Sequence, residues 1–326
     1  MTPQSITVPS DHAGATLAAL VRGCLPGRSW SEVRRLIETR HVKIGKDLCL
    51  DPARRLHEGD VIEIATRPAP KPEVPEDKII RHLDEHVVVA EKPAGMNTVR
   101  HPAERSWPLE RRQRSPTLED ILPPLVAMRE GKKRKGPPPR LRVVQRLDKE
   151  TSGLVVFART PLAQRELARQ FHRHTVVRRY LAVVPGYLAP QRIANRLVRD
   201  RGDGRRGGTT EPGIGKEATT HVEVRERLGG YTLLECRLET GRTHQIRIHL
   251  AELGHPVCGD PVYFANPRPG AEVRKDTSGA PRLALHAAEL GFTHPVGGEL
   301  LHWEMPLPQD LQDFVEKLRK TSKASE

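Results

Sequence analysis

Asp148 is the residue of this sequence best suited to catalysis, because basic side chains flank it. It lies in the segment QRLDKETSGL (145–154), close to Arg146 and Lys149. A carboxylate beside cationic groups is kept ionised, and it can then act as a nucleophile or stabilise positive charge. Spacing alone leaves a plain surface ion pair as the more frequent explanation, so the role of Asp148 depends on what the fold places around it.

A second segment, ETGRTHQIRIHL (239–250), runs from a predicted strand through a glycine into a predicted helix. A helix N-terminus behind Thr-Gly-Arg-Thr favours anion binding, so Arg242 could take a phosphate, and Arg247 could face a carboxylate. His244 and His249 are five residues apart, which does not put two metal ligands on one helical face. No carboxylate or cysteine completes a ligand set, and we expect no metal site here.

Tyr180 lies near the start of the alternating segment RRYLAVV (178–184), a pattern that predicts a strand. A tyrosine in this position is either a core residue or a platform on which a nucleic-acid base can stack. The sequence has no phosphate-binding P-loop and no Gly-x-Gly-x-x-Gly that opens a helix after a strand, so a nucleotide cofactor is not indicated.

The composition favours a polyanionic partner. The 326 residues include 54 Lys and Arg against 41 Asp and Glu, a net charge of +13. No apolar stretch approaches the ~18–20 residues of a membrane span, and the polar N-terminus lacks a signal core, so we expect a cytoplasmic protein with no membrane association. The four cysteines form no Cys-x-x-Cys pair and are expected to be free thiols.

The length suggests two domains, and the patterning predicts where they divide. Residues 14–66 form a small module with a helix near 16–21, a second helix capped by Ser29, and strands at 41–44 and 61–64. The second helix carries Arg34 and Arg35, with Arg40 following. Residues 1–13 are expected to be a loose arm, and the Pro-rich segment 67–78 a linker.

Residues 79–320 are predicted to form the larger domain, of mixed α+β class with a mainly antiparallel sheet. Strands are predicted at 87–90, 154–158, 179–184, 218–225, 231–238 and 283–292, and helices at 161–172, 243–253 and 311–320. Residues 103–140 are expected to be a long loop with one helix at 118–128 and the basic run Lys132 to Lys135, which could contact phosphate. Residues 200–216 are predicted to be a Gly-rich basic loop.

The motifs together resemble the RluA-like family of RNA pseudouridine synthases. The matching segments, in the order of the family, are EKPAGM (91–96), QRLDKETSGLVVFA (145–158), RRYLAVVPG (178–186), LETGRTHQIRIHLAELGHPVCGDPVY (238–263) and RLALHAAELGFTHPVGGE (282–299). Residues 14–64 resemble the alpha-L-type RNA-binding module, less closely. Three departures are visible: Leu17-Ala18 replaces a Leu-Asp pair, Ile44 replaces Asn before Gly45, and Gln145 replaces the usual His.

The resemblance implies that the protein isomerises uridine to pseudouridine in structured RNA, with ribosomal RNA favoured over tRNA. It implies a catalytic Asp148, a base-stacking Tyr180 and the family's basic residue at Arg247. It implies no cofactor, and we expect a monomer. We expect RNA-binding roles for Arg146, Arg242, Thr243, His244, Arg34, Arg35 and Arg40.

Two other functions are compatible with parts of the sequence. A catalytically silent RNA-binding or ribosome-assembly protein would share the basic surface. A metal-dependent nuclease would need clustered carboxylates, which the acidic residues near these motifs do not form by spacing.

Overall fold

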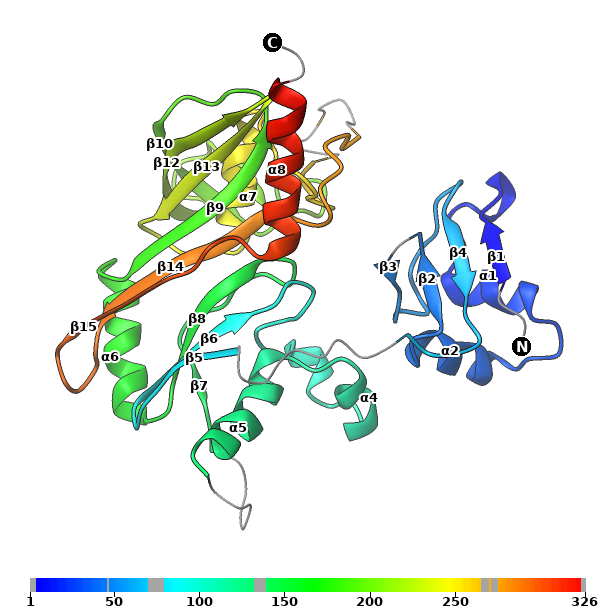
Figure 1. The fold of residues 1–326 in the computed structure, drawn as a ribbon, viewed down its shortest axis with the longest axis horizontal. Coiled ribbons are helices and arrows are strands. Elements are labelled where there is room, and N and C mark those ends of the chain that lie inside the picture. The colour runs from blue at the N-terminus through cyan, green and yellow to red at the C-terminus, as the bar shows by residue number, and fades with distance from the viewer. Residues whose placement is uncertain are drawn as a thin grey trace. The chain divides into compact units, whose positions relative to one another are not determined.

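The computed structural model describes residues 4–45, 47–69, 79–131, 139–264, 270 and 275–323 (Figure 1). The chain divides into two compact units, one made of residues 1–74 and 107–115 and the other of residues 75–106 and 116–326. Most of the predicted linker, at 70–78, and the basic run at 132–135 lie outside the described residues.

The first unit packs two short helices on a four-stranded sheet. Its helices are α1 (Leu17–Cys24) and α2 (Trp30–Glu38), and the strand order is β1 (Gln4–Thr7), β4 (Val61–Ile64), β2 (Val42–Ile44) and β3 (Asp47–Leu48). As predicted, Ser29 caps α2, in a capping box with Glu32. Val33 and Ile37 face the aliphatic core of this unit, which leaves Arg34 and Arg35 exposed.

The prediction of a loose arm at residues 1–13 is wrong. Residues Gln4–Thr7 form β1, which pairs antiparallel with β4, and Val8 is 1% exposed in the core. A short polar strand gives little sequence signal, because backbone pairing rather than side-chain alternation holds it in place. Residues 107–115, including α4 (Leu109–Arg114), also cluster with the first unit, where Arg114 pairs with Glu38.

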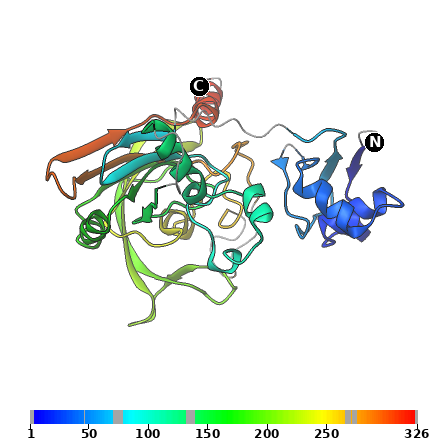
Figure 2. The same cartoon turned by 90° about the horizontal axis from the view of Figure 1, so that it is seen from below.

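The second unit is built on an eleven-stranded sheet within the described residues. Its path runs β11-β10-β12-β13-β9-β14-β8-β6-β5, with β15 beside β14 and β7 beside β8. Figure 2 shows from a second direction that the sheet is curved rather than flat. The strands are β5 (Ile80–Leu83), β6 (Val87–Lys92), β7 (Arg142–Val143), β8 (Ser152–Ala158), β9 (Val177–Pro185), β10 (Gln191–Val198), β11 (Gly207–Thr209), β12 (Lys216–Leu228), β13 (Tyr231–Leu238), β14 (Leu285–Thr293) and β15 (Leu300–Glu304).

Four α-helices of the described residues pack on this sheet. α5 (Leu118–Arg129) contacts β5, α6 (Pro161–His172) contacts β8 and β14, α7 (Gln245–Glu252) contacts β11 and β12, and α8 (Gln309–Lys323) contacts β12. Two short 3-10 turns, Ser10–His12 and Pro102–Glu104, complete the assignment. No described helix has the length and apolar character of a bilayer span.

The predicted fold class is confirmed, because the sheet is mixed and almost wholly antiparallel, with β8 and β14 as its parallel pair. The predicted helix at 161–172 and strand at 231–238 have the observed bounds. The loop predicted at 200–216 contains the short strand β11, and strands β10 and β15 were not predicted.

Candidate active site

Asp148 lies in the loop between β7 and β8, and neighbouring segments hold this loop on both sides. The hydroxyl of Thr98 donates to the carbonyl oxygen of Leu147 (2.8 Å) and accepts from the Leu147 amide (3.0 Å). The ammonium of Lys92 donates to the carbonyl oxygen of Lys149 (3.0 Å). The residues on either side of Asp148 are therefore fixed, while its own side chain remains 22% exposed.

Lys92 is a fully buried lysine that ties the loop to the turn after β6. Besides the Lys149 bond, its Nζ donates to the carbonyl oxygens of Pro93 and Met96, each at 2.7 Å. Burial lowers the pKa of Lys92 to about 7, against the opposing effect of the Glu150 and Asp148 charges. Three carbonyl acceptors match the three N–H groups of an ammonium, so this site is built for the protonated form.

Gly153, at the start of β8 just after the Asp148 loop, allows β8 to lie close to β14. Its φ is +119°, and a Cβ there would overlap the backbone carbonyl of Ala287. We expect Gly153→Ala to destabilise the second unit by about 2–5 kcal/mol, from backbone strain plus overlap. Urea unfolding measures this.

Gly230→Ala is the matched control, since Gly230 also has a positive φ (+86°) but nothing lies within 4 Å of its Cβ position. Strain alone predicts a loss of about 1–2 kcal/mol there. Equal losses for the two variants would contradict the close approach of β8 and β14.

Arg247 is held in a buried ion pair and reaches Asp148 from it. Its Nε and Nη2 donate to the two carboxylate oxygens of Asp260 (2.7 and 2.8 Å), and its Nη1 donates to Asp148 (3.4 Å). Burial acts to lower the pKa of Arg247, but the hydrogen bonds and charge of Asp260 and the charge of Asp148 outweigh it and raise that pKa. The guanidinium is thus a fixed positive charge beside Asp148.

Tyr180 lies on β9, between Cys236 of β13 and Ala287 of β14. It is 9% exposed, and burial raises the pKa of its hydroxyl. Tyr180 lines the same cleft as Asp148 and Arg247, a cavity of about 830 Å³. The three residues that the resemblance singled out are therefore brought together.

The cleft also contains the four residues of the second unit for which RNA binding was predicted: Arg146, Arg242, Thr243 and His244. Arg146 and Arg242 are exposed, and Nε of Arg242 donates to the carbonyl oxygen of Glu217 (2.8 Å). Arg34, Arg35 and Arg40 belong to the first unit, where Nε of Arg40 donates to the carbonyl oxygen of Ala69 (3.0 Å).

His244 lies closer to Asp148 than its predicted role suggested. It has a left-handed backbone (φ 59°) at the start of α7, and its Nε2 is 4.0 Å from Asp148. Its Nδ1 is 2.9 Å from the hydroxyl of Tyr263. Burial lowers the pKa of His244 despite the Asp148 charge, so the neutral ring is the form present near pH 7.

Asp260 and Lys92 were not identified from the sequence as parts of the site. Both lie within segments that match the family, GDPVY and EKPAGM, and this match was the sequence feature that could have identified them. The side chain of Asp260 is fully buried and also accepts hydrogen bonds from the amides of Val262 (2.8 Å) and Tyr263 (3.0 Å). It anchors Arg247, which in turn contacts Asp148.

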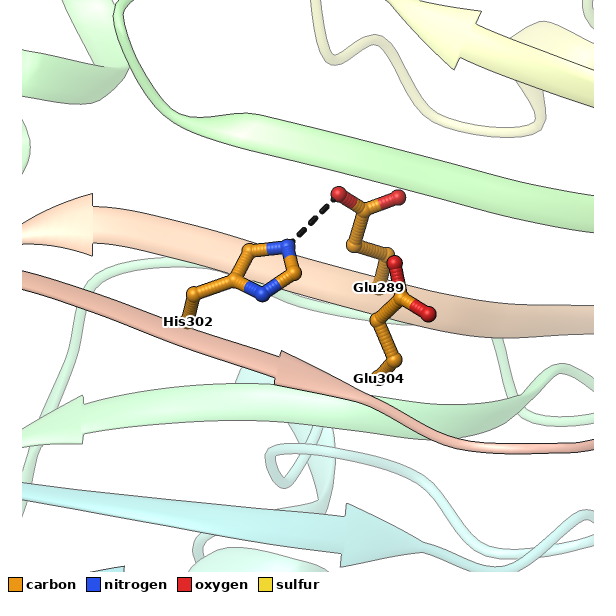
Figure 3. A group of neighbouring side chains, drawn as sticks. All are labelled: Glu289, His302 and Glu304. Atoms are coloured by element: carbon orange, nitrogen blue, oxygen red, sulfur yellow. Dashed lines mark hydrogen bonds and ion pairs between the residues drawn. The ribbon is translucent and has the colours of Figure 1, made fainter.

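Among the described residues, one group has side chains spaced to hold a metal ion: Glu289, His302 and Glu304, on β14 and β15 (Figure 3). None of the three lines the cleft. Arg179 pairs with Glu289 and lies 3.1 Å from Glu304, so the chain itself supplies a cation to both carboxylates. We interpret the group as an ion-pair network.

Asp148, the buried Arg247 that contacts it and Tyr180 thus line one open cleft. A family model described as RNA pseudouridylate synthase matches residues 86–252, which include Asp148, Tyr180 and Arg247. The chain belongs to this family and is an RNA pseudouridine synthase.

The relatives extend the match beyond that segment. Ribosomal large subunit pseudouridine synthase D of Neisseria meningitidis (serogroup A) is 38% identical over 322 residues, covering 96% of this chain and 81% of that protein. The protein of the same name from Nitrosomonas europaea is 35% identical, covering 98% and 89%. The solved structure of human RNA pseudouridylate synthase domain containing 4 has a TM-score of 0.58 at 24% identity, covering 74% and 94%, and supports the fold.

Proposed function

We propose that this protein converts specific uridines of large-subunit ribosomal RNA into pseudouridine, with Asp148 as the catalytic group. The observation that carries the proposal is the contact of Asp148 with Arg247, itself fixed by Asp260, inside the cleft that Tyr180 lines. The names of the relatives support the choice of RNA. Such a role fits a monomer acting in the cytoplasm, where ribosomal RNA is available.

The reaction rearranges one nucleotide without adding or removing atoms. The bond from N1 of uracil to C1′ of ribose breaks, the base turns, C5 bonds to C1′, and a proton moves from C5 to N1. Asp148 either attacks C1′ or removes the 2′ proton, and both routes need an ionised carboxylate at the sugar. Arg247 holds that carboxylate in place, and Tyr180 stacks on the base.

Access to the target base requires flipping it out of structured RNA, at a cost of a few kcal/mol. Phosphate contacts from basic residues offset that cost. In our proposal Arg146, Arg242, Thr243 and His244 contact RNA around the cleft. We assign RNA binding to the first unit, which includes the predicted module 14–66, and catalysis to the second unit, which includes most of the predicted domain 79–320.

The direct test is to incubate the purified protein with transcripts of large-subunit rRNA, small-subunit rRNA and tRNA, and to quantify pseudouridine in each. We expect product in the large-subunit transcript at one or a few positions. Product confined to tRNA would contradict the substrate assignment. RNA binding without product in any transcript would favour the silent RNA-binding or assembly role.

The proposed module makes a separate prediction. Combining Arg34→Gln and Arg35→Gln removes two exposed charges from α2, and we expect the salt dependence of binding (log K against log[KCl]) to flatten by about 1.4–1.8. The rate of a single bound turnover should not change. Arg54→Gln, exposed on a loop of the same unit, is the control. An unchanged slope for the double variant would remove α2 from the RNA contact surface.

A further inference from the structure

Arg178 is a buried cation of the cleft with no acidic partner among the described residues. It lies on β9 and is 8% exposed. Its Nη2 donates to the carbonyl oxygens of Leu238 (3.2 Å) and Glu239 (2.8 Å), and its Nε has no acceptor in the part of the chain that the structure describes. Arg247, in the same cleft, is by contrast bonded to a carboxylate through two nitrogens.

An unpaired buried charge is costly, so its retention needs a reason. Burial lowers the pKa of Arg178, yet a guanidinium remains protonated at physiological pH. The carbonyl dipoles of Leu238 and Glu239 stabilise this charge only in part, because neither carries a full negative charge. The arrangement is suited to an anion that arrives from outside the chain.

The position of Arg178 identifies where such an anion would lie. Side chains two residues apart on a strand share a face at a spacing of about 7 Å, so Arg178 and Tyr180 are neighbours on one wall of the cleft. The guanidinium lies 5.5 Å from the ring centre of Phe171. Gly241 lies beside the guanidinium. A Cβ at Gly241 would come within 2.7 Å of Nη1 of Arg178, and apart from its chain neighbours the one other atom of the described residues within 4 Å of it is Cζ of the same side chain.

We propose that Arg178 binds a phosphate group of the substrate RNA next to the uridine that stacks on Tyr180. The inference rests on the proposed function, because the anions that RNA brings to this cleft are its phosphates. An arginine has donors in a fixed fork that matches phosphate oxygens. The contact would hold the backbone of the flipped nucleotide while Tyr180 holds its base.

A purely structural role is the competing explanation, in which Arg178 only supports the loop after β13 through its two carbonyl bonds. Two substitutions separate the roles. In Arg178→Gln the charge is gone, while an amide N–H donor remains on a shorter side chain. In Arg178→Lys the charge remains with a different donor geometry. Arg165→Gln, exposed on α6 and outside the cleft lining, controls for the loss of any one positive charge.

The experiment measures binding of each variant to the in vitro transcript of large-subunit rRNA across a series of KCl concentrations. We expect Arg178→Gln to flatten the slope of log K against log[KCl] by about 0.7–0.9, the value of one phosphate contact, and Arg178→Lys to keep most of the slope. Arg165→Gln should match the wild type. A normal slope for Arg178→Gln, or a larger defect for Lys than for Gln, would overturn the proposal.

Gly241→Ala keeps the test decisive if either Arg178 variant fails to fold. The added methyl group displaces the Arg178 guanidinium without removing its charge, and the glycine does not have a positive φ. We expect weaker binding at every KCl concentration with a smaller change of slope than for Arg178→Gln, because the charge stays in the cleft while its donors move away from the phosphate. Unchanged binding would contradict the proposal. The binding readout does not depend on turnover, so a wild type that binds this RNA but forms no pseudouridine would overturn the proposed function and leave this comparison intact.

Discussion

Asp148→Asn is expected to reduce pseudouridine formation by at least about 10³-fold, the scale seen when a catalytic nucleophile or base is removed. Asparagine keeps the size of the side chain and can still accept a hydrogen bond from Arg247. It cannot attack C1′ or take the 2′ proton as a carboxylate can. The loss should therefore appear in the single-turnover rate with saturating enzyme, measured as pseudouridine formed in the large-subunit transcript.

The rest of the molecule should tolerate this substitution. Asp148 is 22% exposed and its contact with Arg247 is 3.4 Å long, whereas Asp260 supplies the main anchor of that arginine. The stability change is therefore expected to stay within about 1 kcal/mol. Glu150→Gln, in the same loop, is the matched control and should retain activity. Comparable rates for Asp148→Asn and the wild type would remove Asp148 from the chemistry.

Arg247→Met is expected to lower both stability and rate. It leaves the fully buried carboxylate of Asp260 without its charged partner, and breaking a buried ion pair in this way costs about 3–5 kcal/mol. It also frees the Asp148 side chain, and losing one fixed donor at a reaction centre costs about 10²–10³ in rate. Thermal unfolding and single-turnover rates, taken well below the unfolding midpoint, measure the two effects.

The double variant Arg247→Met with Asp260→Met separates them. With both buried charges removed, much of the stability should return, because the unpaired carboxylate is gone. The rate should stay low, because nothing then holds Asp148. Recovery of the rate together with the stability would show that Arg247 supports only the fold.

Local sequence patterns predicted the elements around the site well. The helix at 161–172 has a Pro at its first position and a Thr cap, and strand 231–238 has an apolar centre and begins directly after the turn residue Gly230, so both were predicted with their observed bounds. Strands β1, β10 and β15 were missed because most of their side chains are exposed or half-buried, which leaves little apolar signal.

The pairings inside the site depend on contacts between distant segments. The sequence suggested that Arg247 could face a carboxylate, but its main partner, Asp260, lies across a turn after α7. The bonds of Lys92 run to backbone carbonyls, which every residue has, so no residue type marks them. The sequence predicted only RNA binding for His244, because His244 and Asp148 are far apart in the sequence and only the folded sheet brings their side chains together.

The measurement that tests the central claim most directly is a map of pseudouridines in ribosomal RNA from cells that lack this gene, complemented with the wild type or with Asp148→Asn. We predict that one or a few large-subunit positions lose pseudouridine, that the wild-type gene restores them, and that Asp148→Asn, produced at the same level, does not. Restoration by Asp148→Asn would contradict the assignment of this aspartate as the catalytic group, and a map unchanged by loss of the gene would contradict the choice of RNA.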